Sequence, residues 1–174
     1  MAVRYFRSRG WIFALEPIVD RQSAIAQLEE VLPLAAQWAS DQKQRVLCEG
    51  VPLSKAQMAD AKSIGVKNPD RVRLLRVEAI PVPAHPKLKA AAASLNFLTA
   101  APSGLSLEYG IFVRSDCWRD RALIAHELVH TAQYERLGGI VPFLQTYISQ
   151  CATVGYANAP LELEAAAKAE RICG

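Results

Sequence analysis

His126-Glu127-Leu128-Val129-His130 is the stretch on which the predicted fold rests, because it lies in the longest helix that the sequence indicates, from about Asp116 to Leu137. Residues four apart on an α-helix share one face, so the rings of His126 and His130 can reach one metal ion. Glu127 lies at the edge of that face, where its carboxylate can contact a water held by the metal. The pattern H-E-x-x-H therefore predicts a zinc site with two imidazole ligands and a carboxylate as general base.

An alternating segment precedes this helix. From Leu105 to Val113, nine residues place apolar and other side chains on alternate sides, which predicts one half-buried strand. Gly110 removes a side chain from that strand and would let another backbone approach closely; the alternatives are a β-bulge or a position that simply tolerates glycine. Ser115-Asp116 is predicted to cap the helix, and Gly138-Gly139 to end it. In this layout the strand can lie beside the metal site and accept an extended peptide by strand addition.

The rest of the chain is predicted to be mainly helical. Apolar spacing and cap residues indicate helices at about Asp20–Pro33, Leu34–Leu47, Ser54–Ile64, Pro86–Phe97, Val141–Ala152 and Leu161–Ile172. A second strand is expected from Arg71 to Ile80, and residues Met1 to Val19 are expected to form a short strand or an irregular arm. The length of 174 residues suits one domain. We expect an α+β fold over residues 1–174, with a helical part in 1–70 and the sheet, the H-E-x-x-H helix and a later ligand helix in 71–174.

Composition and charge set few limits on function. The formal charge of +3 and the 21% of charged residues favour neither nucleic acid nor a membrane surface as a partner. Glu16 and Pro17 interrupt the apolar run that begins at Trp11, so we do not expect this run to be a signal peptide. No segment approaches the about 20 apolar residues that span a bilayer. The four cysteines are scattered, which favours reduced thiols in a cytoplasmic protein, with a disulfide as the alternative. The oligomeric state stays open.

A catalytic zinc site needs a third protein ligand, and the chain has no histidine after His130. The acidic residues downstream are Glu135, Glu162, Glu164 and Glu170. Glu135 lies on the wrong side of the same helix. Glu162 and Glu164 are about 200° apart on a later helix, so only one of them can face the metal. We expect Glu162 to be the ligand, with Glu164 as the alternative. His85, in a proline-rich turn, is a weak candidate for a metal ligand or a catalytic acid.

The H-E-x-x-H motif, followed by a helix that opens with Glu162-x-x-Ala165, resembles the gluzincin class of zinc metallopeptidases. In that class the third ligand is a glutamate on a downstream helix. The resemblance covers about Leu105 to Ala166. Ala166 is a departure, because gluzincins with the pattern E-x-x-A-D have an aspartate there.

A narrower resemblance rests on Gln133 and on the segment Asn158 to Ala165. These residues look like those of small bacterial zincin-like domains of uncharacterised function, some of which are modules of larger toxin or injection-system proteins. Gln133 lies one turn past His130, where it can hydrogen-bond groups behind the ligands or simply fill a contact between helices.

The resemblance implies a mainly helical zincin-like domain with a small sheet beside the active-site helix. It implies a Zn²⁺ ion held by His126, His130 and Glu162, and a peptide or protein substrate attacked by a zinc-bound water that Glu127 activates. Tyr156, in the loop before the third-ligand helix, is the candidate for holding the oxyanion, with a packing role as the alternative. The alternative function is a zincin-fold binding or structural module of a larger bacterial secretion- or toxin-associated system with little or no turnover.

Overall fold

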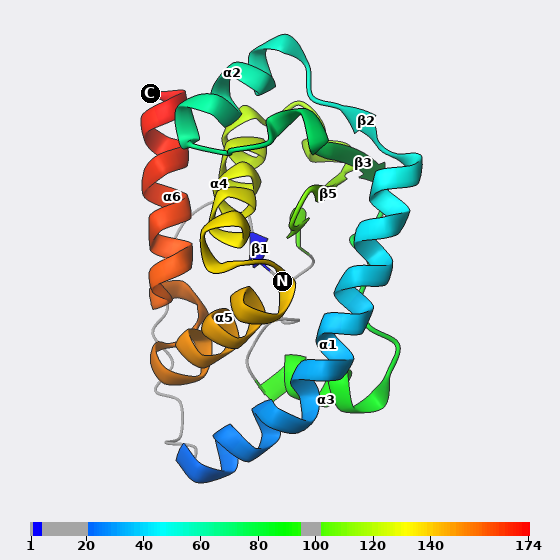
Figure 1. Ribbon diagram of the computed structural model, residues 1–174, viewed down its shortest axis with the longest axis vertical. Helices are drawn as coiled ribbons and strands as arrows, with labels where there is room; N and C mark the ends of the chain where they lie inside the picture. The colour runs from blue at the N-terminus through cyan, green and yellow to red at the C-terminus, as the bar shows by residue number, and fades with distance from the viewer. Residues whose placement is uncertain (1, 5–20, 95–101) are drawn as a thin grey trace.

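A small mixed sheet lies beside the H-E-x-x-H helix in the computed structural model, which describes residues 2–4, 21–94 and 102–174 (Figure 1). The strands are β1 (Ala2–Arg4), β2 (Val51–Pro52), β3 (Arg73–Val77), β4 (Gly104–Leu107) and β5 (Gly110–Arg114). Their order across the sheet is β1-β4-β5-β3-β2. The β3–β5 pair is parallel, and the other neighbouring pairs are antiparallel.

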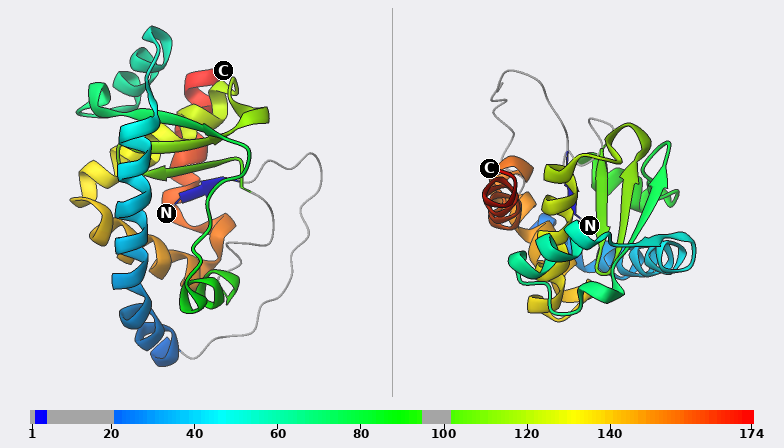
Figure 2. Two further views of the ribbon diagram at one scale, coloured as in Figure 1. Left: turned by 90° about the vertical axis from the view of Figure 1, so that its right-hand side faces the viewer. Right: turned by 90° about the horizontal axis from the view of Figure 1, so that it is seen from above.

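Helices make up most of the described chain. They are α1 (Arg21–Glu49), α2 (Lys55–Ile64), α3 (Pro86–Ser94), α4 (Arg121–Leu137), α5 (Ile140–Val154) and α6 (Pro160–Cys173). Helix α1 packs on one side of the β4–β5 pair, α4 packs on the other side, and α6 packs against α4 (Figure 2). The predicted α+β fold, mainly helical with a small sheet beside the H-E-x-x-H helix, is confirmed. The prediction of a single domain stays a prediction.

The predicted single strand from Leu105 to Val113 is wrong. The segment is a hairpin, in which Glu108 and Tyr109 form a two-residue turn between β4 and β5 and Glu108 has a φ of 60°. Leu107 and Gly110 are paired and share a face although they are three residues apart, so the turn places the apolar residues before it and those after it on opposite faces. Alternation alone therefore does not distinguish one long strand from two short paired ones.

Pairing also changes which residues share a face. Leu105 and Leu107 pack in one cluster with Phe112, whereas Ile111 and Val113 pack in the second cluster with residues of α4. Both faces of the hairpin are buried, so the expectation of a half-buried strand is also wrong. The expected close backbone approach at Gly110 is present without a bulge.

Gly110 marks where α1 crosses the sheet. A Cβ atom at this position would lie 3.0 Å from the Cβ of Val46 and 3.3 Å from the carbonyl oxygen of Lys43. These atoms belong to α1, so the missing side chain lets the helix backbone approach the strand.

The two helices predicted on either side of Pro33 are one helix, because α1 continues through that residue from Arg21 to Glu49. Proline removes one intrahelical hydrogen bond. Leu32 before the proline and Ala35 after it both pack against the core, which holds the helix together on both sides of that position.

The start of the H-E-x-x-H helix also differs from the prediction. A 3₁₀ turn at Ser115–Cys117 precedes α4, and Asp120, not Ser115 or Asp116, caps the helix by accepting a hydrogen bond from the backbone N–H of Leu123 at 3.0 Å. The hydroxyl of Ser115 instead donates to Glu78, and Asp116 pairs with Arg114. The predicted end at Gly138 is confirmed, with a left-handed φ of 97°.

The other predicted elements are found with shifted ends. Ser54 caps α2 through a capping box with Gln57, and Gly65 ends that helix in the left-handed conformation. Strand β3 begins at Arg73, because residues Pro69–Arg71 form a 3₁₀ turn. The expected arm after Arg4 and the end of the third helix near Phe97 lie outside the described residues.

Two further findings concern the whole described chain. None of its helices is both long enough and apolar enough to cross a membrane. All four cysteines, Cys48, Cys117, Cys151 and Cys173, are free thiols.

Glu135 ties the end of α4 to the segment after α2. Its carboxylate accepts hydrogen bonds from the backbone N–H groups of Lys67 at 2.6 Å and Asn68 at 3.0 Å, and from the hydroxyl of Tyr109 at 2.9 Å. Burial raises the pKa of Glu135, but these hydrogen bonds lower it by more, and the net pKa lies below its ordinary value.

We predict that Glu135→Gln lowers the free energy of unfolding at pH 7 by about 1–3 kcal/mol, because donors to a carboxylate lose their charged acceptor. A carboxyl whose pKa is depressed on folding stabilises the fold above its unfolded pKa of about 4.3, and this stability is lost as the pH falls through the folded pKa. Urea unfolding of both proteins between about pH 7 and pH 3 should therefore show a difference that shrinks on acidification. Glu170→Gln, on the exposed side of α6, is the control. If the difference in the free energy of unfolding did not change with pH, the charge of the Glu135 carboxylate would not be what stabilises the fold.

Candidate metal centre

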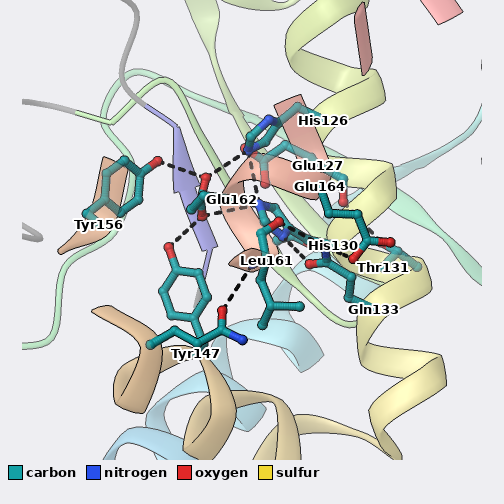
Figure 3. A network of polar contacts seen from close by, with 12 residues as sticks. His126, Glu127, His130, Thr131, Gln133, Tyr147, Tyr156, Leu161, Glu162 and Glu164 are labelled. Carbon is teal, nitrogen blue, oxygen red and sulfur yellow. Dashed lines mark hydrogen bonds and ion pairs between the residues drawn. The ribbon is translucent and has the colours of Figure 1, made fainter. Parts of the chain in front are cut away.

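Two neighbouring helices bring three potential metal ligands together. His126 and His130 project from α4, and Glu162 projects from the first turn of α6 (Figure 3). The Nε2 atoms of the two histidines are 3.0 Å apart. The carboxylate of Glu162 has Oε2 at 3.2 Å from the Nε2 of His126 and Oε1 at 3.4 Å from the Nε2 of His130.

This set of atoms fits a zinc ion. One ligand atom from each residue lies within 4.8 Å of the others. Zinc–ligand bonds of about 2.0–2.2 Å place tetrahedral ligand atoms roughly 3.3–3.6 Å apart, close to the spacings in this cluster. Two imidazoles and one carboxylate are also a donor set that leaves a fourth position of a catalytic zinc site open. The three residues would hold the ion, and their chemistry suits it.

Glu162 is held in place by two tyrosines. The hydroxyl of Tyr147 donates to its Oε1 at 2.6 Å, and the hydroxyl of Tyr156 donates to its Oε2 at 3.1 Å. Burial raises the pKa of this carboxyl, but His130 and His126 lower it by more, so the net pKa lies well below its ordinary value. Glu162 is therefore an anion with defined orientation.

Tyr147 was not expected at this site. It lies on α5 and is fully buried, and burial together with the charge of Glu162 raises its pKa well above the ordinary value. It therefore stays a neutral hydrogen-bond donor at physiological pH. In the sequence it occupies an apolar position of a predicted helix, beside Phe143 and Leu144, which gives no sign of a polar role. Tyr156, which was predicted near the site, is there, but its hydroxyl is directed to the Glu162 carboxylate.

Gln133 determines which ring nitrogen of His130 donates a hydrogen bond to it. The Oε1 of Gln133 lies 2.7 Å from the Nδ1 of His130, while its amide nitrogen donates to the carbonyl oxygen of Leu161 at 2.9 Å and to Glu164 at 3.0 Å. Because the amide nitrogen faces two acceptors, its carbonyl oxygen must face the ring, and the Nδ1 of His130 must carry the proton. When the His130 ring is neutral, its Nε2 then carries the lone pair that a metal would need. Gln133 thus fills both roles considered for it, a helix contact and a bond behind a ligand.

Glu164, the alternative third ligand, lies outside the cluster. Its two oxygens accept hydrogen bonds from Arg136 at 2.8 and 2.7 Å, and Lys168 lies 2.9 Å away. The Arg136 guanidinium lowers the pKa of Glu164 to about 2. The structure therefore brings Glu162, and not Glu164, to the two histidines. His85 is not part of the cluster either, since its Nδ1 accepts a hydrogen bond from the backbone of Lys87 at the start of α3.

Glu127 lies beside His126 on α4 and is fully buried against β4. A Cβ atom at Gly104 would lie 2.6 Å from the Oε1 of Glu127. The strand therefore accommodates the carboxylate only because residue 104 has no side chain. The predicted base, the two predicted histidine ligands and the predicted carboxylate ligand are thus placed in one buried region by α4, α6 and β4.

Comparison with known proteins does not assign this chain to a family. No family model, no curated protein and no solved structure matches it. The interpretation of the site therefore rests on its own geometry.

We predict that Gln133→Leu weakens zinc binding by about 10- to 100-fold, the usual effect of removing a hydrogen bond that orients a histidine ligand. Gln44→Leu, on the exposed side of α1, is the matched control and should bind zinc as the wild type does. Competition with a chromophoric chelator measures the affinity. Equal affinity of the Gln133 variant and the wild type would show that this hydrogen bond does not orient His130 for a metal.

Proposed function

We propose that this protein is a zinc-dependent peptidase in which His126, His130 and Glu162 hold the metal. The observation that carries the proposal is the convergence of two imidazole nitrogens and one carboxylate, from two helices, within 4.8 Å. The placement of Glu127 next to the first of these ligands supports a catalytic role over a purely structural one, because a structural zinc site needs no base and closes its fourth position with another ligand.

The proposed chemistry divides between the ion and the chain. A zinc ion in this position supplies positive charge that acidifies a water and polarises a peptide carbonyl. The carboxylate of Glu127 accepts the proton of the attacking water and then donates it to the leaving amine. The bond between Gln133 and His130 keeps the ring in the tautomer that can bind a metal.

Tyr156 is the proposed residue for stabilising the oxyanion. Its side chain is partly exposed, whereas Tyr147 is fully buried, and both donate to Glu162. The Tyr156 hydroxyl can turn to the substrate oxygen while Tyr147 keeps its hydrogen bond to Oε1 of Glu162, so the carboxylate still has a donor. We propose a peptide or protein as the substrate, a cytoplasmic location and no nucleic-acid partner, in keeping with four free thiols and a mild net charge.

A second candidate function is a zinc-binding or structural module with little or no turnover. One observation favours it, namely that the exposed fractions of His126, Glu127, His130 and Glu162 are 2%, 0%, 0% and 6%. A substrate cannot reach side chains that are this buried unless part of the structure moves. Catalytic turnover distinguishes the two candidates, whereas zinc binding does not.

We predict that the purified protein binds one zinc ion and that Glu162→Ala loses it, whereas Glu164→Ala retains it. The two substitutions remove the same number of atoms from the same helix, so each controls for the other. Elemental analysis after dialysis measures the bound metal. Zinc retained by the Glu162 variant at wild-type affinity would exclude Glu162 as a ligand, and a wild-type protein that takes up no zinc would end the peptidase proposal.

We predict that Glu127→Gln keeps the metal and lowers hydrolysis of a mixed peptide library by about 100- to 10,000-fold, the usual contribution of a general base. Gly104→Ala should give the same pattern, because the added Cβ displaces the Glu127 carboxylate, the mobile end of a side chain, and leaves the metal ligands in place. Ser106→Ala, on the same face of β4, is the control. Mass spectrometry of the library measures cleavage, and full activity in the Glu127 variant would remove it as the base.

A further inference from the structure

Strand β1 occupies the edge of the sheet that lies nearest to the candidate metal centre. Its residues Ala2–Arg4 pair antiparallel with β4, and this places β1 at one end of the strand order and β2 at the other (Figure 2). Within the described residues, the sheet edge of β4 is therefore already taken by a segment of the same chain, from the opposite end of the sequence to the metal ligands.

The pairing register brings β1 to the proposed base. Arg4 is paired with Gly104, the residue whose missing side chain leaves room for the carboxylate of Glu127. Strand β1 also contacts α4, the helix that carries Glu127 and both histidines. Its ribbon passes behind Glu162 and Tyr156 in the close view of the site (Figure 3).

The position of β1 matters because of how a peptide would bind. An extended peptide binds most readily to a sheet by adding a strand to an open edge, where backbone groups provide hydrogen bonds independent of sequence. Gly104 of β4 faces Glu127, and β1 fills the edge of β4 at this residue. The burial of the four site residues agrees with a closed state of the site.

We propose that β1 is an autoinhibitory strand, which occupies on β4 the place of an extended polypeptide and must leave before one can reach Glu127. This inference rests on the proposed peptidase function for its consequence, although the closure itself does not depend on it. Strand β1 suits reversible release, because it pairs over three residues and has a neighbour on one side only. A ladder this short is held by few hydrogen bonds, each contributing about 0.5–1.5 kcal/mol.

The test weakens β1 without changing the site. The double variant Ala2→Pro/Val3→Pro removes at least one N–H from the β1–β4 ladder, because successive N–H groups of an antiparallel strand point alternately toward and away from the partner. Val51→Pro is the matched control: it creates the same proline pair with Pro52 in β2, at the opposite edge of the sheet.

Two rates are measured on the zinc-loaded full chain, namely removal of zinc by an excess of chelator and hydrolysis of a mixed peptide library. We expect both to rise by about tenfold in the β1 variant, the change that corresponds to about 1.4 kcal/mol in the closed-to-open equilibrium. A synthetic peptide of residues 1–8 should slow both rates again, and a scrambled peptide should not. The Val51 variant should match the wild type.

The outcomes separate the inference from the function on which it rests. Unchanged rates in a β1 variant that still unfolds cooperatively would overturn the autoinhibitory strand and leave the peptidase proposal in place. Faster zinc removal with no hydrolysis in any variant would support the closure by β1 and count against the peptidase.

Amide hydrogen exchange of the wild type decides the matter if the β1 variant does not fold. We expect amides of β4 that face β1 to exchange faster than those of the central strand β5, through local opening. Equal protection of β4 and β5 would show that β1 is a permanent part of the sheet and would overturn the inference.

Discussion

The buried carboxylate of Glu162 is the constraint on which the arrangement of the C-terminal half depends. A carboxylate removed from water costs several kcal/mol unless donors or cations replace its hydration. Here Tyr147 and Tyr156 donate to it and the two histidines lie beside it. These partners come from three different segments, so α4, α5 and the turn before α6 must all be in place before Glu162 can be buried.

Gln133 also ties α4 to α6. It links His130 to the backbone of α6 at Leu161 and to Glu164, which Arg136 of α4 also holds. Through Gln133, the candidate ligand His130 on α4 is thus linked to the start of α6, the helix that carries the candidate ligand Glu162. Polar networks of this kind are stable only when every member has a partner, and the same bonds that hold the helices together orient the candidate ligands.

Two glycines position the hairpin between α1 and α4. Gly110 admits the backbone of α1 on one side, and Gly104 admits the carboxylate of Glu127 on the other. Because β1 pairs with β4 at Gly104, the same strand that accommodates the proposed base also carries the candidate inhibitory segment. The site is therefore closed by sheet pairing on one side and by helix packing on the other.

Much of the site followed from local rules. The helical spacing of His126 and His130 put both rings on one face, and the absence of later histidines directed the search for a third ligand to a carboxylate. Helical geometry allowed only one of Glu162 and Glu164 to point inward, and the structure places Glu162 beside the histidines. The mainly helical α+β class, the helix that begins near Ser54 and the helix end at Gly138 also followed from sequence, because helix ends depend on a few neighbouring residues.

What the sequence left undecided depends on contacts between distant residues. Alternation from Leu105 to Val113 persists through a two-residue turn, so only pairing shows that it is a hairpin. Pro33 lies inside α1 because packing along the helix offsets one lost hydrogen bond. Tyr147 lies at an apolar position of its own helix, and nothing local marks it as a partner of a carboxylate 15 residues away. Periodicity and capping are set within one element, whereas the partner of a polar side chain and the occupant of a sheet edge are set only when separate elements pack together.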